Sequence, residues 1–361
     1  MSGDYAIISS HLHDTLGNTD QGKAHIFYRT GNSWARQVTL TASDGAPNDR
    51  FGISVSISGD YAIVGSYLHD TGGNSDQGKA YIYYRTGTTW SEQAILISSN
   101  GAANDYFGES VSISGDYALV GASFQGTQNK GSAYIFKRSG TSWTEQAILT
   151  ASDGAQDDYF GVNTSLSGDY AVVGAGQHNT NGNSNQGKAY VFKRSGTSWA
   201  QQAMLTASDG AVDDRFGERT NISGDYIVVG AWRHNTSGQA DRGKAYIYKR
   251  EGTGWTQQAI LVSPDGAAGD QFGSGVSISS DYAVIGANKN DSKRNDMGKV
   301  YIYKRDNSTW NFIATLTPSD GFLQDNFGSS TSISGNHIIV GSPSHPIANT
   351  RIGAIYFFKR D

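Results

Sequence analysis

The residues best suited to chemistry recur in one polar loop of this 361-residue chain. A His stands at 13, 69, 178, 234 and 345, and an Asp or Asn follows it in four copies. A later acid or amide recurs at Asp20, Asp76, Asn185, Asp241 and Asp296. Imidazole and carboxylate groups are metal ligands, so each copy of this loop is a candidate metal site.

Two interpretations of this loop compete. Each copy offers one His, so the three imidazoles of a zinc site would have to come from separate copies, which argues against zinc. Ca²⁺ bound by carboxylates and carbonyls is the metal alternative, with Asp70 and Asp76 among its ligands. The structural interpretation is that Asx-turns and side-chain-to-backbone hydrogen bonds stiffen a long loop. We favour it and expect no cofactor to be required.

A second acidic loop reads "SNGAANDYFG" at residues 99–108. Its last acid recurs two residues before a Phe-Gly pair, at Asp49, Asp105, Asp158, Asp214, Asp270 and Asp325. We expect these carboxylates to cap the turn that delivers Phe-Gly into the fold. Coordination of a cation or a sugar is the alternative, in which Asp49 and Asp105 join the candidate metal ligands.

The chain offers little for catalysis. It has no cysteine, which excludes a Cys nucleophile, thiolate metal sites and disulfides. Glu109 and Glu218 directly follow Phe-Gly, but they lie two repeats apart. The paired carboxylates of glycoside hydrolysis need a separation under about 10 Å, and this spacing does not ensure it. We predict no catalytic residues and no enzymatic activity, with a glycan lyase or hydrolase as the weaker alternative.

These loops belong to a repeat. An "SGDY"-like element recurs seven times at spacings of 53 to 56 residues. Each copy reads as four short strands, at 51–58, 60–66, 78–85 and 89–98 in the second copy, with turn residues between them. Four-stranded units of this length predict an all-β fold, a seven-bladed β-propeller with antiparallel blades. The predicted single domain, 1–361, has units at about 1–50, 51–106, 107–159, 160–215, 216–271, 272–326 and 327–361.

The turns and strands carry their own signals. Gly59-Asp60 suits a type II′ hairpin, and Gly or Asn307 recurs in the link between the third and fourth strands, which predicts one repeated backbone shape. Ser54 and Ser56 are small enough to let a neighbouring blade approach closely. We interpret the Trp that opens the fourth strand of six copies as a packing anchor, at 34, 90, 143, 199, 255 and 310.

The first and last blades are predicted to have three strands each, because the first copy lacks its "FGxSVSIS" strand and the last its Trp strand. Three explanations are open. The chain could be trimmed from a longer one, the ring could tolerate short blades, or a strand from another chain could add to the open edge. The third makes strand addition or self-assembly a candidate partner interaction.

These motifs resemble the FG-GAP repeat family, which includes the propeller of integrin α subunits. They comprise Phe-Gly at 51–52, 107–108, 160–161, 216–217, 272–273 and 327–328, each followed by a "VGA"-like strand end. The resemblance covers essentially the whole chain. It implies that ligands bind on the loop face, the side that carries the links between second and third strands and the blade-to-blade loops. The family's calcium loop lies between the first two strands, and here only a Gly-Asp turn stands there, so those sites are not expected.

On a near-symmetric array, departures from the repeat are the candidate ligand contacts. Trp232 and Arg233 interrupt the fifth copy, Phe124 lies in the shortened loop of the third, and the sixth is basic at Lys289, Lys293 and Arg294. Aromatic rings stack on sugars and anchor protein contacts. The further candidates come from the polar loops of the second, fourth and fifth copies: Tyr67, His69, Asp70, His178 and His234.

Composition narrows the partners. A net charge of −5 gives no electrostatic reason to expect nucleic acid or an anionic membrane. We see no apolar run long enough for membrane insertion and no signal or anchor in this chain. The resemblance implies a non-enzymatic extracellular or cell-surface module for adhesion or recognition, binding a protein or glycan. A structural unit of a larger surface protein is the alternative.

Overall fold

The computed structural model describes residues 1–15, 17–291, 295–347, 350–351 and 353–360. Lys293 and Arg294 therefore lie outside the described residues. The described part is built from β-strands joined by turns and loops, and its fold is a seven-bladed β-propeller. The chain divides into two compact units, Met1–Ala175 with Val191–Gln201 and Gly176–Tyr190 with Gln202–Asp361. A single domain over 1–361 remains a prediction.

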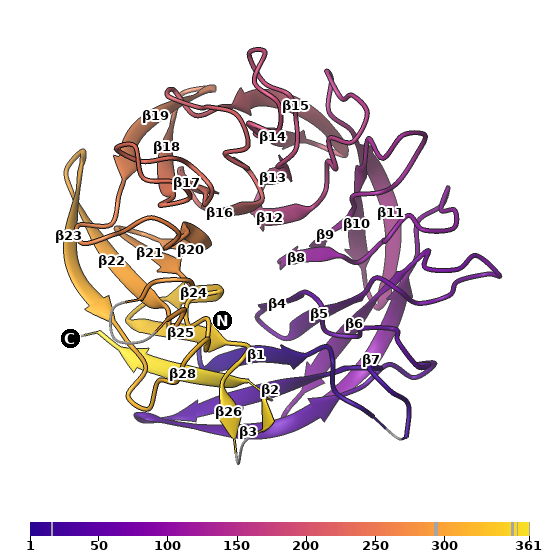
Figure 1. The fold of residues 1–361 in the computed structure, drawn as a ribbon. Helices are drawn as coiled ribbons and strands as arrows, with labels where there is room; N and C mark the ends of the chain where they lie inside the picture. The colour runs from indigo at the N-terminus through magenta and orange to yellow at the C-terminus, as the bar shows by residue number, and fades with distance from the viewer. Residues whose placement is uncertain (16, 292–294, 348–349, 352, 361) are drawn as a thin grey trace. The chain divides into compact units, whose positions relative to one another are not determined.

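The first three blades belong to the first unit, and within each the strands lie in sequence order (Figure 1). The first blade has three strands: β1 (Tyr5–Ser10), β2 (Lys23–Thr30) and β3 (Ser33–Leu40). The second has four: β4 (Val55–Ser58), β5 (Tyr61–Ser66), β6 (Lys79–Thr86) and β7 (Thr89–Leu96). The third consists of β8 (Ser110–Ser114), β9 (Tyr117–Ala122), β10 (Ser132–Ser139) and β11 (Ser142–Leu149).

The fourth blade contains β12 (Asn163–Ser167), β13 (Tyr170–Ala175), β14 (Lys188–Ser195) and β15 (Ser198–Leu205). The fifth contains β16 (Arg219–Ser223), β17 (Tyr226–Ala231), β18 (Lys244–Glu251) and β19 (Gly254–Leu261). The sixth contains β20 (Phe272–Ser279), β21 (Tyr282–Ala287), β22 (Lys299–Asp306) and β23 (Thr309–Leu316). The seventh has three strands, β24 (Ser330–Ser334), β25 (His337–Ser342) and β28 (Ala354–Lys359), beside a small hairpin of β26 (Pro346–Ile347) and β27 (Thr350–Arg351).

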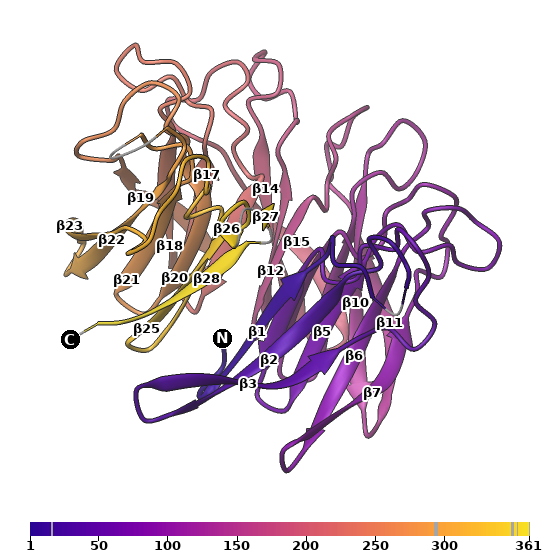
Figure 2. The ribbon, with the colours of Figure 1, turned by 60° about the horizontal axis from the view of Figure 1, so that its bottom comes forward.

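The predicted blade architecture is confirmed, including the three-stranded first and last blades. The largest difference from the predicted strand boundaries is that β4 begins at Val55 instead of Phe51, whereas β5, β6 and β7 differ by one or two residues at an end. Gly52 has a φ of 95°, which breaks the extended backbone and turns the chain into the strand. The repeated turns are confirmed as well, with φ of 57° at Gly59, 62° at Gly87 and 55° at Asn307. In Figure 2 the first unit has tight hairpins at one end of its sheets and long loops at the other.

The two glycines of the repeat exist because neighbouring blades meet there. Phe107 is fully buried and packs edge-to-face on Tyr134, with ring centroids 5.3 Å apart. The N–H of Gly108 then donates to the carbonyl of Gly121 at 2.9 Å. A Cβ on Gly65 of the preceding blade would overlap the carbonyl oxygen of Gly108. Phe-Gly and the later Gly are therefore two halves of one inter-blade contact.

The serines of the inner strands also link blades. The Oγ of Ser54 accepts a hydrogen bond from the N–H of Val111 at 3.0 Å, and Ser56 accepts from Ile113 at 3.2 Å. These N–H groups belong to the innermost strand of the next blade. The hydroxyls thus satisfy a strand edge that would otherwise be open, while their small size permits the predicted close approach.

The outermost strands of neighbouring blades are joined by a hydrogen bond at a β-bulge. Opposite Ile82 and Tyr83 the register on β7 skips Gln93, whose Oε1 accepts the indole N–H of Trp143 in the next blade at 3.2 Å. The same pair forms at four more junctions: Gln37 with Trp90, Gln146 with Trp199, Gln202 with Trp255 and Gln258 with Trp310. These five Trp residues are confirmed as packing anchors. The sixth blade has Ile313 at the bulge.

Candidate functional site

The acid before Phe-Gly caps its own turn, as predicted. The carboxylate of Asp49 accepts the N–H of Ala46 at 2.6 Å, and that of Asp105 accepts the N–H of Ala102 at 2.7 Å. The bond repeats at Asp158, Asp214, Asp270 and Asp325. All six side chains are buried, so they are committed to the turn.

The first acid of the same loop reaches into the next blade. Asp44 accepts hydrogen bonds from the Tyr81 hydroxyl at 2.7 Å and the Lys79 ammonium at 2.6 Å. Burial alone would raise the pKa of Asp44, but these two donors outweigh it and hold the pKa below its usual range. The sequence analysis missed this partner. The signal was the Lys-x-Tyr of the third strand, which recurs wherever the loop begins with Asp, except at the last junction.

The recurring His lies inside this arrangement. His69 is 6% exposed, and its Nε2 lies 3.3 Å from the Asp44 carbonyl oxygen and 3.7 Å from the Asp49 carboxylate. We call this set a blade junction: Asp44, Asp49, His69, Lys79 and Tyr81. His234 occupies the same place between Asp209 and Asp214. His178 is equally buried and has its Nδ1 3.0 Å from the Thr180 hydroxyl.

The junction entering the third blade lacks three of these ionisable groups. Asn100 replaces the first Asp and accepts the Tyr134 hydroxyl at 2.8 Å. Gln125 stands where other copies have His, and Ser132 where they have Lys, with a 2.6 Å hydrogen bond from Ser132 to Gln125. The capping acid is kept as the buried Asp105, whose carboxylate accepts the Ala102 N–H at 2.7 Å.

The remaining polar loop residues support the structural interpretation. The side chain of Asp70 accepts the N–H of Asp76 at 3.0 Å, and the same turn forms in the other copies of this loop. Among the residues that the structure describes, no three His, Cys, Asp or Glu side chains are grouped so as to hold a metal ion. Calcium binding at Asp70, Asp76, Asp49 and Asp105 therefore stays a prediction.

The predicted contact residues Tyr67 and Phe124 lie in one row of aromatic rings with two residues that the sequence analysis missed. Tyr67 and Phe124 both contact Tyr106, with ring centroids 5.3 Å and 4.6 Å away, and Phe124 also contacts Tyr159 at 4.7 Å. We call these four rings the aromatic strip. They come from four successive loops of the first unit and are each partly exposed.

The backbone aims two rings of the aromatic strip. Tyr106 has a φ of 59° and Tyr159 a φ of 53°, in the left-handed region that bulky residues rarely adopt. Every residue before a Phe-Gly pair shares this conformation, namely Arg50, Tyr106, Tyr159, Arg215, Gln271 and Asn326. The aromatic identity of two copies was the signal that could have revealed the strip.

Acidic groups surround the aromatic strip. Burial raises the pKa of Tyr67, and Glu109 and Asp76 add to the rise while Arg50 opposes it. Burial, Asp76 and Glu109 likewise raise the pKa of Tyr106. Arg50 is paired with Asp20 at 3.3 Å, and Glu109 accepts a hydrogen bond from Ser123. The strip is thus lined by neutral rings, hydroxyls and carboxylates.

The candidates in the second unit lie in a network. The Trp232 indole N–H donates to Glu218 at 2.7 Å, and Glu218 also lies 3.5 Å from Arg215. Arg233 lies 5.5 Å from the Trp232 ring centroid and 3.7 Å from Asp241. Lys289 is likewise paired, with its Nζ 3.1 Å from Asp296. All three candidates are partly exposed, and their contact with a ligand remains a prediction.

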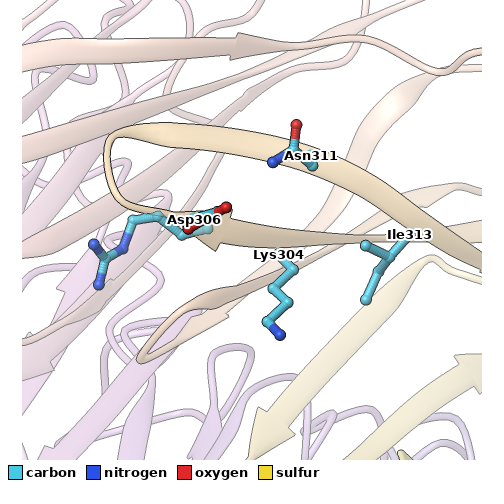
Figure 3. Close-up of a pocket in the computed structure, with 5 residues that line it drawn as sticks. Lys304, Asp306, Asn311 and Ile313 are labelled. Carbon is cyan, nitrogen blue, oxygen red and sulfur yellow. The ribbon is translucent and has the colours of Figure 1, made fainter.

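A shallow hollow of about 350 Å³ lies away from these loops, at the hairpin between β22 and β23 (Figure 3). Lys304, Arg305, Asp306, Asn311 and Ile313 line it. Arg305 is paired with Asp281, and Lys304 lies 5.8 Å from the ring centroid of Tyr282. These cations serve the packing of the sixth blade, so the hollow adds no group suited to catalysis.

A model of a family described as FG-GAP repeat matches the chain six times, at residues 34–83, 90–136, 143–192, 199–248, 255–303 and 310–358. Each match begins at the Trp of one blade and ends in the third strand of the next, so the family's unit contains a complete blade junction. A comparison with curated protein sequences gives no match. In the described part of the chain no helix is long and apolar enough to cross a membrane.

Proposed function

The chain belongs to the FG-GAP repeat family, and we propose that it is a non-enzymatic, extracellular or cell-surface binding module. It recognises a protein or glycan ligand through its loop face and serves in adhesion or recognition. The observation that carries the proposal is the aromatic strip of Tyr67, Tyr106, Phe124 and Tyr159.

The strip differs from the packing aromatics of the blades. Rings such as Phe107 and Tyr134 are fully buried, and the same buried pair recurs from the second to the sixth blade, as a core requires. The strip rings are partly exposed, and two of them occupy a backbone conformation that costs about 1 kcal/mol or more for a bulky residue. Exposed aromatic clusters on loops are typical of binding surfaces.

The absence of enzymatic activity is part of the proposal. Glu109 and Glu218 were the acids best placed for catalysis in the sequence. Glu109 is hydrogen bonded to Ser123, and Glu218 binds Trp232 and Arg215. These contacts give both carboxylates a positioning role in the loops, which supports a binding module over a hydrolase or lyase.

The test is binding of labelled chain to an array of extracellular proteins and to a glycan array. We expect binding to one of them by the wild type, and its loss in Tyr106→Ala and Phe124→Ala. The matched control is Phe312→Ala, which removes a 42%-exposed Phe from β23 in the second unit. Binding that survives both strip substitutions, or no binding to either array, would contradict the proposal.

A second candidate function is assembly into a larger surface structure. In the described sheets β28 lies at the outer edge of the seventh blade, and the outer strand β23 of the sixth blade has Ile313 46% exposed. Other blades bury a bulge Gln against the next Trp strand at this position. We propose that a strand of a second copy adds there. Sedimentation at high concentration tests this: a self-association weakened by Ile313→Asp supports assembly, and a monomer at all concentrations excludes it.

A further inference from the structure

We propose that the aromatic strip is a binding site for a neutral polysaccharide chain, whose sugar rings lie on Tyr106, Phe124 and Tyr159. The inference rests on the proposed binding function and names the ligand class of that site. Its strongest support is the combination of contiguous ring surface with an uncharged or acidic surround. Each of these two features argues against a different class of ligand.

The shape of the site favours an extended ligand. The four rings form one unbroken series, with neighbouring centroids 4.6 to 5.3 Å apart. Tyr67 and Tyr106 belong to the second repeat and Phe124 and Tyr159 to the third, so the series follows the order of the blades. A ligand that repeats along its length gains avidity from such a series, because each unit meets an equivalent surface.

The ring orientations also suit flat, weakly polar faces. Tyr67 and Tyr106 pack edge-to-face at 86°, and the next two pairs are tilted by 56° and 59°, while part of each ring stays exposed. The C–H faces of a sugar are apolar and pack on aromatic surface, while its hydroxyls need donors and acceptors at the edge. The hydroxyls of three tyrosines, the Asp76 carboxylate and the amide of Asn129 beside Asp157 supply them.

Charge excludes the other stackable ligands. Aromatic platforms that bind single-stranded nucleic acid lie in positively charged grooves. Asp76 and Glu109 lie near Tyr67 and Tyr106, Asp157 accepts a hydrogen bond from Asn129 beside Tyr159, and the Arg50 cation near Tyr67 is already paired with Asp20. Nucleic acids, uronic-acid polymers and sulfated glycans would all be repelled. A neutral polysaccharide meets no such penalty.

The positive backbone φ of Tyr106 and Tyr159 adds pre-organisation. The repeat holds this position between the capping Asp and the buried Phe, so the direction of each ring is set before the ligand arrives. Tyr also has only two side-chain torsions, so little conformational entropy is lost on binding. Modest affinity per sugar is then enough when several sugars bind together.

The test is affinity electrophoresis of the full chain in native gels that contain neutral polysaccharides of several linkages, with alginate as the anionic comparison. We expect retardation by at least one neutral polymer and none by alginate. Phe124→Ala, Tyr106→Ala and Tyr159→Ala should each weaken the neutral interaction about tenfold. Phe124→Trp should retain it, and Phe312→Ala serves as the matched control. Near-UV circular dichroism checks that each variant is folded, and the Trp variant keeps the test valid if an Ala variant unfolds.

The outcomes separate the inference from the proposed function. Retardation by no neutral polymer, or retardation that the three strip substitutions leave unchanged, overturns the inference. If the chain then binds the protein array and loses that binding in Phe124→Ala, the loop-face function holds and its ligand is a protein. Retardation by alginate alone would overturn the charge argument.

Discussion

The blade junctions and the aromatic strip are formed by residues of the same two kinds of loop. The junction residues are turned into the fold, whereas the rings of the strip are partly exposed. At the junctions, Asp44, Asp49 and His69 turn inward and satisfy one another, the backbone and the next blade. In the strip, Tyr106 comes from a position next to the capping Asp, yet its ring lies partly exposed. In this fold the residues that recur from blade to blade pack the blades, and we propose that some of those that depart from the repeat bind a ligand.

A second comparison, between two junctions, shows what the repeat conserves. The junction entering the second blade has Asp44, His69 and Lys79, and the one entering the third has Asn100, Gln125 and Ser132 at the same places. In both, the first loop residue accepts the hydroxyl of a buried Tyr. This hydrogen bond is constant, whereas the ionisable groups beside it vary from junction to junction.

The largest expected effect comes from the inter-blade glycine. A Cβ in Gly121→Ala would overlap the carbonyl oxygen of Gly161, so the variant should lose about 3 kcal/mol of unfolding free energy. Urea denaturation measures this. Gly254→Ala is the control, since its nearest atom lies 3.7 Å from the added Cβ, and its stability should change by less than about 0.5 kcal/mol. Equal stability of the two variants would contradict the packing account.

The next effect concerns the capping acid. Asp105→Ala leaves the Ala102 N–H without its acceptor and should cost about 2 kcal/mol of unfolding free energy. The same substitution at Asp306, an exposed acid at the hairpin between β22 and β23, should cost less than about 1 kcal/mol. Thermal unfolding of the two variants checks the order, and a reversed order would contradict the capping role.

The strip should respond in the opposite sense, with binding lost and stability kept. Tyr106→Asn places a residue that tolerates a φ of 59°, so relief of backbone strain offsets the lost ring contacts. We expect the unfolding free energy to stay within about 1 kcal/mol of the wild type while ligand affinity falls about tenfold. A variant that binds normally would show that the Tyr106 ring is not part of the ligand site.

The smallest expected effect is a difference in how the unfolding free energy depends on pH when the second-blade junction is converted to the residues of the third-blade junction. The folded state holds the pKa of Asp44 below its unfolded value of about 4, so this group contributes stability above pH 4 that is lost as pH falls through the folded pKa. The triple variant Asp44→Asn, His69→Gln, Lys79→Ser copies the third-blade junction. Between pH 5 and pH 3 it should lose less stability than the wild type, by under about 1 kcal/mol. Parallel pH profiles would contradict this assignment.

Much of the fold could be predicted from the sequence because every blade repeats the same instructions. A turn is predicted by Gly59 and by Asn307, and a packing contact by each Trp of the series. The structure has these features at the predicted positions. The site was harder. His69 was a candidate metal ligand because an imidazole can bind a metal ion. In the structure it is buried beside Asp44 and Asp49, which belong to the preceding blade-to-blade loop.

The strip was missed for the complementary reason. Tyr106 and Tyr159 precede Phe-Gly and read as part of the turn. Their contact with Phe124 depends on the left-handed backbone of the capped loop. The sequence around these residues does not predict that conformation. Trp232, the most conspicuous departure from the repeat, instead uses its indole N–H to bind Glu218.

Ligand binding by the aromatic strip is best tested by comparing wild type, Phe124→Ala and Phe312→Ala on the neutral-glycan and protein arrays. We expect wild type and Phe312→Ala to bind alike and Phe124→Ala to lose the signal while remaining folded. A Phe124→Ala signal equal to that of the wild type would contradict this expectation.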